Sequence, residues 1–219
     1  MLYLLRRAEP RDASAAARLI LEAAPSLSAI LGDRSTALTA AQAAFRADRT
    51  ELSHRFGMVE EGDGLRGLII AFPGRLFGSL KLGTGVQLAR AAGARHAADL
   101  IRRGRVLDKL MPNPGRNVLY VSVLAVAPES RGQGVGVVLL ERLVAAADWM
   151  GLGVALDVGL ENESARHLYE RLGFVETSVR QTTEVDRRQI PTPGMARLER
   201  RPRRERPGDA RASAEESGG

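Results

Sequence analysis

Along residues 1–200 the pattern of hydrophobic and polar positions switches repeatedly between the period of a strand and that of a helix. Short apolar or alternating runs near the N-terminus, around a Gly-rich turn at 61–64 and in four later segments predict strands. These strands are expected at 3–7, 56–60, 65–72, 117–126, 154–158, 174–183 and 195–200. The run at 117–126 is apolar on both alternating faces, which indicates a central strand covered on both sides.

The segments between these strands carry apolar residues at helical spacing. Asp12 is a plausible N-cap for a first helix that ends near Ala24. Further helices are expected over Ser35–Leu52, over Gly136–Trp149 with Gly151 as the C′ residue, and over Asn162–Arg171. Strands and helices therefore mix along one chain, which predicts an α+β domain covering 1–200.

Residues 75–111 have apolar side chains at helical periods, but Gly83, Gly85, Gly93 and Gly104 interrupt them, and 112–115 reads Pro-Asn-Pro-Gly. We expect a basic helical insertion at 75–116, before the central strand. The wider segment 73–116 holds nine Lys or Arg residues against two Asp, so it accounts for the net charge of +6. Such a run is more often a solvated helix face than a binding surface. Residues 201–219 lack large apolar side chains, and we expect a disordered tail there.

Composition excludes several kinds of site. The chain has no cysteine, which excludes disulfides, thiolate metal ligands and a cysteine nucleophile. Its three histidines are far apart in the sequence, so we expect no metal site. No apolar run approaches the ~20 residues of a membrane span, and the first charges follow a very short apolar stretch. We therefore expect a cytoplasmic protein with no membrane partner.

The segment from Val126 to Gly136 carries the clearest chemical signal. Pro128 ends the central strand, and a loop with Gly132, Gly134 and Gly136 leads directly into a helix. Glycines let an anion approach the backbone, and N–H groups at a helix start have no intrahelical acceptor. Together with the positive charge of Arg131, this predicts a pyrophosphate-binding loop.

The spacing of the loop distinguishes between cofactors. A P-loop would end in Gly-Lys-Ser/Thr, and a dinucleotide fold would show Gly-x-Gly-x-x-Gly; this loop reads Arg-Gly-Gln-Gly-Val-Gly. Arg131-x-x-Gly134-x-Gly136 instead resembles the signature of GCN5-related N-acetyltransferases (GNAT). The segment from Asn162 to Phe174 is similar to that family's Asn-x-x-Ala-x-x-x-Tyr-x-x-x-Gly-Phe helix. The close resemblance covers about 118–178.

The resemblance implies a GNAT-like fold, in which a central mixed, mostly antiparallel sheet is flanked by helices. It also implies acetyl-CoA as cosubstrate, lying between two strands that splay apart. The implied binding residues are Leu124, Ala125, Val126, Arg131, Gly132, Gln133, Gly134, Val135, Gly136, Val137 and Asn162. Asn162 could equally act only as a helix N-cap.

The implied reaction is direct transfer of acetyl to a primary amine on a small molecule or a protein. Tyr169 resembles the tyrosine that protonates the departing sulfur, although it could also be an aromatic of the buried helix stripe with Leu168 and Leu172. A backbone N–H near Val126 would polarise the thioester carbonyl.

The sequence contains several residues that could accept the proton of the attacking amine. Candidate general bases are Glu60, Glu61, Tyr120, Ser122 and Glu161, and the sequence does not choose among them. A non-catalytic acetyl-CoA-binding sensor or interaction module is the alternative function, and a homodimer is compatible with the sequence. Nucleic acid is not the expected partner, because the five arginines in 201–219 stand beside four acidic residues.

Overall fold

The computed structural model describes residues 3–24, 31, 33–93 and 97–203. It contains a seven-stranded sheet with the order β1-β2-β3-β4-β5-β7-β6. The strands are β1 (Leu4–Arg7), β2 (Gly57–Glu61), β3 (Leu65–Pro73), β4 (Val118–Val126), β5 (Gly153–Gly159), β6 (Val175–Gln181) and β7 (Gly194–Arg200). β4 and β5 are parallel and every other neighbouring pair is antiparallel, so the predicted mixed, mostly antiparallel sheet is confirmed.

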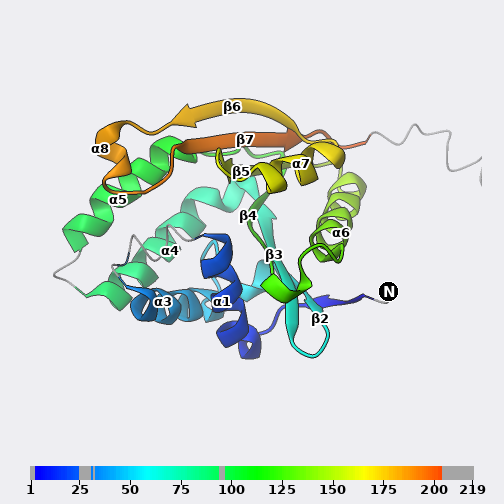
Figure 1. The fold of residues 1–219 in the computed structure, drawn as a ribbon, viewed down its shortest axis with the longest axis horizontal. Coiled ribbons are helices and arrows are strands. Elements are labelled where there is room, and N and C mark those ends of the chain that lie inside the picture. Colours follow the sequence, from blue (N-terminus) through cyan, green and yellow to red (C-terminus); the bar gives the residue numbers. More distant parts are fainter. Residues whose placement is uncertain (1–2, 25–30, 32, 94–96, 204–219) are drawn as a thin grey trace, which may run out of the picture.

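Helices cover both faces of this sheet (Figure 1). The helices are α1 (Ala13–Ala23), α3 (Arg34–Arg46), α4 (Phe77–Ala92), α5 (Ala97–Leu110), α6 (Val135–Trp149), α7 (Glu163–Arg171) and α8 (Glu184–Arg187). Apolar residues of α1 and α3 pack with Leu68, Ile70 and Val123 on one face. Residues of α6 and α7 pack with Ile69 and Val121 on the other. No helix in the described ranges is long and apolar enough to cross a membrane.

One expected helix end was wrong, and one expected N-cap residue stands in place without its side-chain cap bond. The helix predicted to reach Leu52 ends at Arg46, because the chain turns there and the hydroxyl of Thr50 donates to the carbonyl of Ala44 at 2.6 Å. That bond satisfies one of the acceptors left free at a helix end. Asp12 directly precedes α1, but its carboxylate does not cap the helix. It accepts instead from the guanidinium of Arg6 and from the backbone N–H of Glu9.

The basic insertion is helical, as predicted, and forms two helices, α4 and α5. Its glycines do not all break them: Gly83 and Gly85 lie inside α4, and only Gly93, with φ +77°, ends it. Gly83 lies inside because α4 approaches the turn after α3 closely. A Cβ built at Gly83 would be 1.8 Å from the carbonyl oxygen of Arg49.

The C-terminal part also differs in detail from the expectation. The strand expected at 174–183 is shorter, and α8 follows it, capped by the hydroxyl of Thr183 on the N–H of Asp186. Residues 201–203 continue from β7, and the backbone N–H of Arg203 donates to Oδ1 of Asp148 at 2.8 Å. The rest of the expected tail, 204–219, lies outside the described residues.

Candidate functional site

An opening in the centre of the sheet defines the candidate site. The parallel pairing of β4 with β5 runs from Val118↔Gly153 to Val121↔Leu156 and then stops, although both strands continue. β4 also carries a bulge at this point. The neighbours Ile70 and Ala71 of β3 pair with Val123 and Val121, so one residue of β4 is skipped between them. A bulge bends its strand and interrupts the ladder. The second half of β4 therefore diverges from β5.

A cleft of about 880 Å³ occupies this divergence. Its walls come from the second half of β4, from the end of β5, from the loop that precedes α6, and from α7. Eleven predicted residues line it, including the candidate proton donor Tyr169: Leu124, Ala125, Val126, Arg131, Gly132, Gly134, Val135, Gly136, Val137, Asn162 and Tyr169. Residues far apart in the sequence thus meet in one hollow, which Glu22 at the end of α1 also lines.

The loop before α6 presents a row of free backbone donors. Gly132 and Gly134 have φ values of +73° and +81°, a conformation that side chains with a Cβ rarely adopt. Within the described ranges, the N–H groups of Gly132 and of 134–137 have no hydrogen-bond acceptor. The start of a 15-residue helix adds the positive end of its dipole. This arrangement suits an anionic group with several oxygen acceptors.

The remaining predicted loop residue, Gln133, is oriented differently. Its side chain does not line the cleft; its Oε1 accepts from Nη2 of Arg66 at 2.6 Å, and its Nε2 donates to the carbonyl of Glu129 at 2.8 Å. Its own carbonyl accepts from the hydroxyl of Tyr3 at 2.7 Å. Gln133 therefore ties the loop to the sheet.

Tyr169 projects from α7 into the cleft. The residue is 7% exposed, and its ring packs on Phe174 with 5.8 Å between centroids. Burial raises the pKa of its phenol to about 12. Its hydroxyl has no hydrogen-bond partner among the described residues, so it can keep its proton and present it to a group in the cleft. Both predicted roles, core aromatic and proton donor, are compatible with this position.

Asn162 caps α7, so the expectation that it acts as a helix N-cap is confirmed. Its Oδ1 accepts from the N–H of Ala165 and from the hydroxyl of Ser164, each at 3.2 Å. Since Asn162 also lines the cleft, its amide NH₂ is available for a second contact.

A buried charged cluster lies where the strands diverge. Asp157 is the first residue of β5 beyond the pairing with β4, and Arg197 faces it on β7. Their side chains are 1% and 5% exposed and make two hydrogen bonds of 2.7 and 2.8 Å. The hydroxyl of Tyr120 donates to Oδ2 of Asp157 at 2.8 Å. Three strands are thus joined next to the opening.

The sequence offered one signal for this cluster, an acidic residue inside the apolar strand 154–158, but its partner Arg197 gave none. The pairing depends on β7 lying next to β5, which no local pattern reveals.

Comparison with known proteins agrees with this geometry. The model of the acetyltransferase (GNAT) family matches residues 48–174, more than half of the chain. The chain belongs to the GNAT family.

Solved structures show the same fold for this GNAT chain. An N-acetyltransferase from Staphylococcus aureus Mu50 is 17% identical with a TM-score of 0.67, and covers 90% of this chain and 99% of its own. A second acetyltransferase is 19% identical with a TM-score of 0.66, at 90% and 98% coverage. The ribosomal-protein-S18-alanine N-acetyltransferase from Escherichia coli is 16% identical with a TM-score of 0.54, at 94% and 98% coverage.

The five base candidates of this GNAT chain now differ clearly. Glu60 is fully buried, Glu61 pairs with Arg6, and Ser122 donates to the carbonyl of Glu51 at 2.6 Å. Burial, followed by the nearby charge of Asp157, raises the pKa of Tyr120 well above its usual value. Glu161 is exposed and accepts weakly from Thr192.

Of these five residues, only Ser122 lines the cleft.

Glu51 is a titratable group that sequence reasoning missed. Burial raises the pKa of its carboxyl to about 7, and the positive charge of Lys81 partly opposes that rise. The backbone of Glu51 is held by Ser122 in the β4 bulge and by Thr84 of α4. Glu51 does not line the cleft. Only the fold brings a residue from the turn after α3 to this place.

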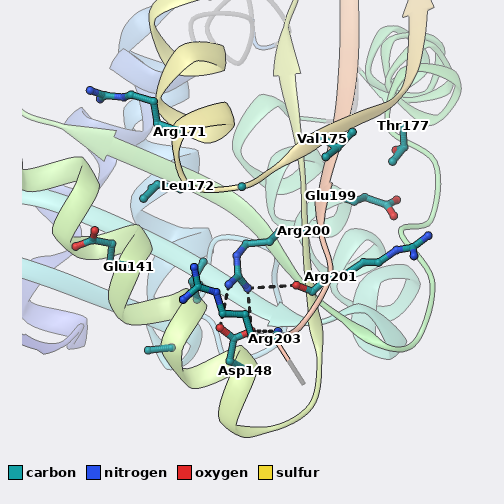
Figure 2. A pocket seen from close by; sticks show the side chains of 13 residues that line it. Glu141, Asp148, Arg171, Leu172, Val175, Thr177, Glu199, Arg200, Arg201 and Arg203 are labelled. Atoms are coloured by element: carbon teal, nitrogen blue, oxygen red, sulfur yellow. Dashed lines mark hydrogen bonds and ion pairs between the residues drawn. The ribbon is translucent and has the colours of Figure 1, made fainter. Parts of the chain in front are cut away.

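The GNAT chain has a second hollow of about 860 Å³ between α6, the end of α7 and the ends of β6 and β7 (Figure 2). Arg200 and Asp148 face each other there through two hydrogen bonds of 2.8 and 3.0 Å. The hollow mixes acidic and basic side chains, and its helical walls come from the second half of α6 and the end of α7 and not from a helix start. The opening between β4 and β5 is therefore the better candidate site. Among the residues described, no group of three His, Asp or Glu could hold a metal ion.

The basic insertion is separate from the cleft. None of the described residues of α4 and α5 lines it, and Lys81 is paired with Asp108 at 2.6 Å. Arg90, Arg105 and Lys109 are exposed, which agrees with the expectation of a solvated helix face.

Proposed function

We propose that this protein is an N-acetyltransferase that uses acetyl-CoA to acetylate a primary amine. One observation carries the proposal: a row of free N–H groups at a helix start opens on the cleft that also holds the hydroxyl of Tyr169. Acetyl-CoA supplies an activated thioester carbonyl together with a pyrophosphate. The fit is supported by the glycine loop, since its free donors match the several oxygens of a pyrophosphate.

Each part of the cleft has a separate task in this proposal. The N–H groups of Gly132 and of 134–137 hold the pyrophosphate, and Arg131 adds a charge. The unpaired backbone groups of Leu124–Val126 bind the pantetheine arm as a neighbouring strand would. The NH₂ of Asn162 gives a further donor on the same arm.

The reaction forms an N–C bond and breaks a C–S bond. The attacking amine loses a proton to solvent or to a base, and the leaving sulfur takes one from the hydroxyl of Tyr169. A backbone N–H near Val126 stabilises the negative charge on the carbonyl oxygen. Because the pKa of Tyr169 is about 12, the phenol stays protonated at neutral pH and is ready to act as an acid.

Binding is tested first, by thermal melts with and without acetyl-CoA. Ligand at ~100 times its dissociation constant should stabilise the wild type by roughly 2.7 kcal/mol. Gly136→Asp places a carboxylate at the loop with its Cβ 3.4 Å from Val126, and should abolish the shift. Gly85→Asp, on α4 with no heavy atom within 4 Å of its Cβ, is the control that should keep it. No shift in the wild type would refute the proposal.

Turnover is tested by a screen of amine acceptors that measures released coenzyme A with a thiol reagent. The chain has no cysteine, so the protein gives no background in this assay. Tyr169→Phe should lower kcat by about 10²-fold with unchanged acetyl-CoA binding. Binding without turnover on any amine would instead support the acetyl-CoA sensor.

A further inference from the structure

A bulge in β3 gives Arg66 an unusual orientation. Glu60 pairs with Gly67 and Glu61 with Leu65, so Arg66 is an extra residue with no partner on β2. In a regular strand its side chain would point away from α6, because Gly67 faces Val135 and Leu139 of that helix. The bulge frees Arg66 from this alternation, and bulges near functional sites commonly redirect a side chain in this way.

Arg66 contacts the glycine loop at three points. Its carbonyl accepts from the N–H of Ala127 at 2.8 Å. Its guanidinium donates to Oε1 of Gln133 at 2.6 Å and to the hydroxyl of Ser130 at 3.3 Å. Ser130 is itself buried at 3% exposure. One side chain thus connects the start and the middle of the loop to the sheet.

A buried carboxylate holds the guanidinium from behind. Glu60 is 0% exposed, and its Oε1 lies 3.4 Å from Nη1 of Arg66. Its other oxygen, Oε2, has no hydrogen-bond partner within the described ranges. A buried negative charge with so little other compensation strongly favours keeping Arg66 in place. The guanidinium is therefore fixed on one side and directed at the loop on the other.

We propose that Arg66, anchored by Glu60, is a positioning residue that fixes the loop 130–134 in its anion-binding conformation. Arg66 does not line the cleft, so it acts through Ser130 and Gln133 and not by touching the ligand. Gln133, which the sequence placed among the binding residues, transmits this restraint to Gly132 and Gly134 on either side of it. The inference rests on the proposed function, because it takes the loop to be the pyrophosphate site.

The test measures affinity for coenzyme A by calorimetry in Gln133→Met and Arg66→Met, alone and together. Each change should weaken coenzyme A binding about tenfold, the effect expected from losing a hydrogen bond to a charged group. The double variant should be no weaker than Arg66→Met, because both changes break the same link. Gln133 is exposed, so Gln133→Met keeps the test valid if Arg66→Met fails to fold.

Arg6→Met is the matched control. Arg6 has 19% side-chain exposure against 18% for Arg66, and it also pairs with buried and half-buried carboxylates, those of Asp12 and Glu61. Its loss should lower stability but leave coenzyme A affinity unchanged, since it does not contact the loop. Pantetheine, which lacks the pyrophosphate, should bind equally to the wild type and Gln133→Met.

The outcomes separate the two proposals. Wild-type affinity in Gln133→Met and Arg66→Met would overturn the role of Arg66 and leave the proposed function intact. Equal losses in Arg6→Met would also overturn it, because the effect would then follow stability alone. Failure of the wild type to bind coenzyme A would overturn the proposed function, and the inference with it.

Discussion

The carboxyl of Glu51 makes the stability of this protein depend on pH in a defined direction. Burial raises the pKa of this carboxyl from 4.5 to about 7 in the folded protein. The unfolded chain keeps a value near 4.5, so between these values the folded state binds a proton that the unfolded state does not. The cost of ionising Glu51 is absent below pH 4.5, grows through this window and is complete above pH 7.

The change Glu51→Gln removes this cost, because the amide is neutral at every pH. A tenfold change in an ionisation equilibrium corresponds to about 1.4 kcal/mol, so the pKa difference gives roughly 3 kcal/mol in favour of the variant at pH 8. At pH 5 the same relation leaves about 1 kcal/mol. Since Glu51 is partly exposed, solvent will reduce both free-energy differences, but the difference at pH 8 will stay larger than the one at pH 5.

Denaturant unfolding at pH 5, 6.5 and 8 measures this difference directly. The exposed Glu170→Gln is the control, and its effect should stay within about 0.5 kcal/mol at each pH. A Glu51→Gln variant whose advantage does not grow from pH 5 to pH 8 would refute the argument. Such a result would mean that the carboxyl is solvated in the folded protein.

Two other predictions concern stability. Gly85→Ala should stabilise α4 by about 0.5–1 kcal/mol, whereas Gly83→Ala should destabilise the protein because its Cβ would meet the carbonyl of Arg49. Thermal melts of the two variants should show shifts in melting temperature of opposite sign, and shifts of equal sign would disprove the close approach. Arg197→Met should lower the free energy of unfolding by about 3–5 kcal/mol, because it leaves Asp157 buried without its cation, and adding Asp157→Leu should recover much of this loss. Denaturant unfolding checks both variants, and an unchanged midpoint in Arg197→Met would contradict the pairing.

Local patterns predicted the strands and most helices well. The double-sided apolar run at 117–126 identified the central strand, and the glycines of the loop identified the start of α6 within one residue. The errors arose where tertiary contacts override propensity. α3 ends early because the turn after it lies against α4, and Asp12 binds Arg6 because β1 is nearby.

The candidate site was predictable in part for the same reason. Residues within one motif, such as those of the glycine loop or Asn162 and Tyr169, can be found from spacing alone. Arg66, Glu51 and Arg197 could not be found, since each acts through a residue at least 40 positions away or through burial. A single sequence does not reveal which strands become neighbours.

The position of β7 in the sheet has a consequence for how the protein is made. β1 to β4 follow one another in both sequence and space, so this half can pair as soon as the chain emerges from the ribosome. Within the part of the chain that the structure describes, β6 pairs only with β7, and β7 also supplies the outer edge pairing of β5. Until residues 194–200 are available, β6 has nothing to pair with and β5 keeps an open edge. The half of the sheet that carries Asp157 can therefore be completed only after synthesis of the last strand, and a translating ribosome that stalls before it would display an unpaired, aggregation-prone intermediate.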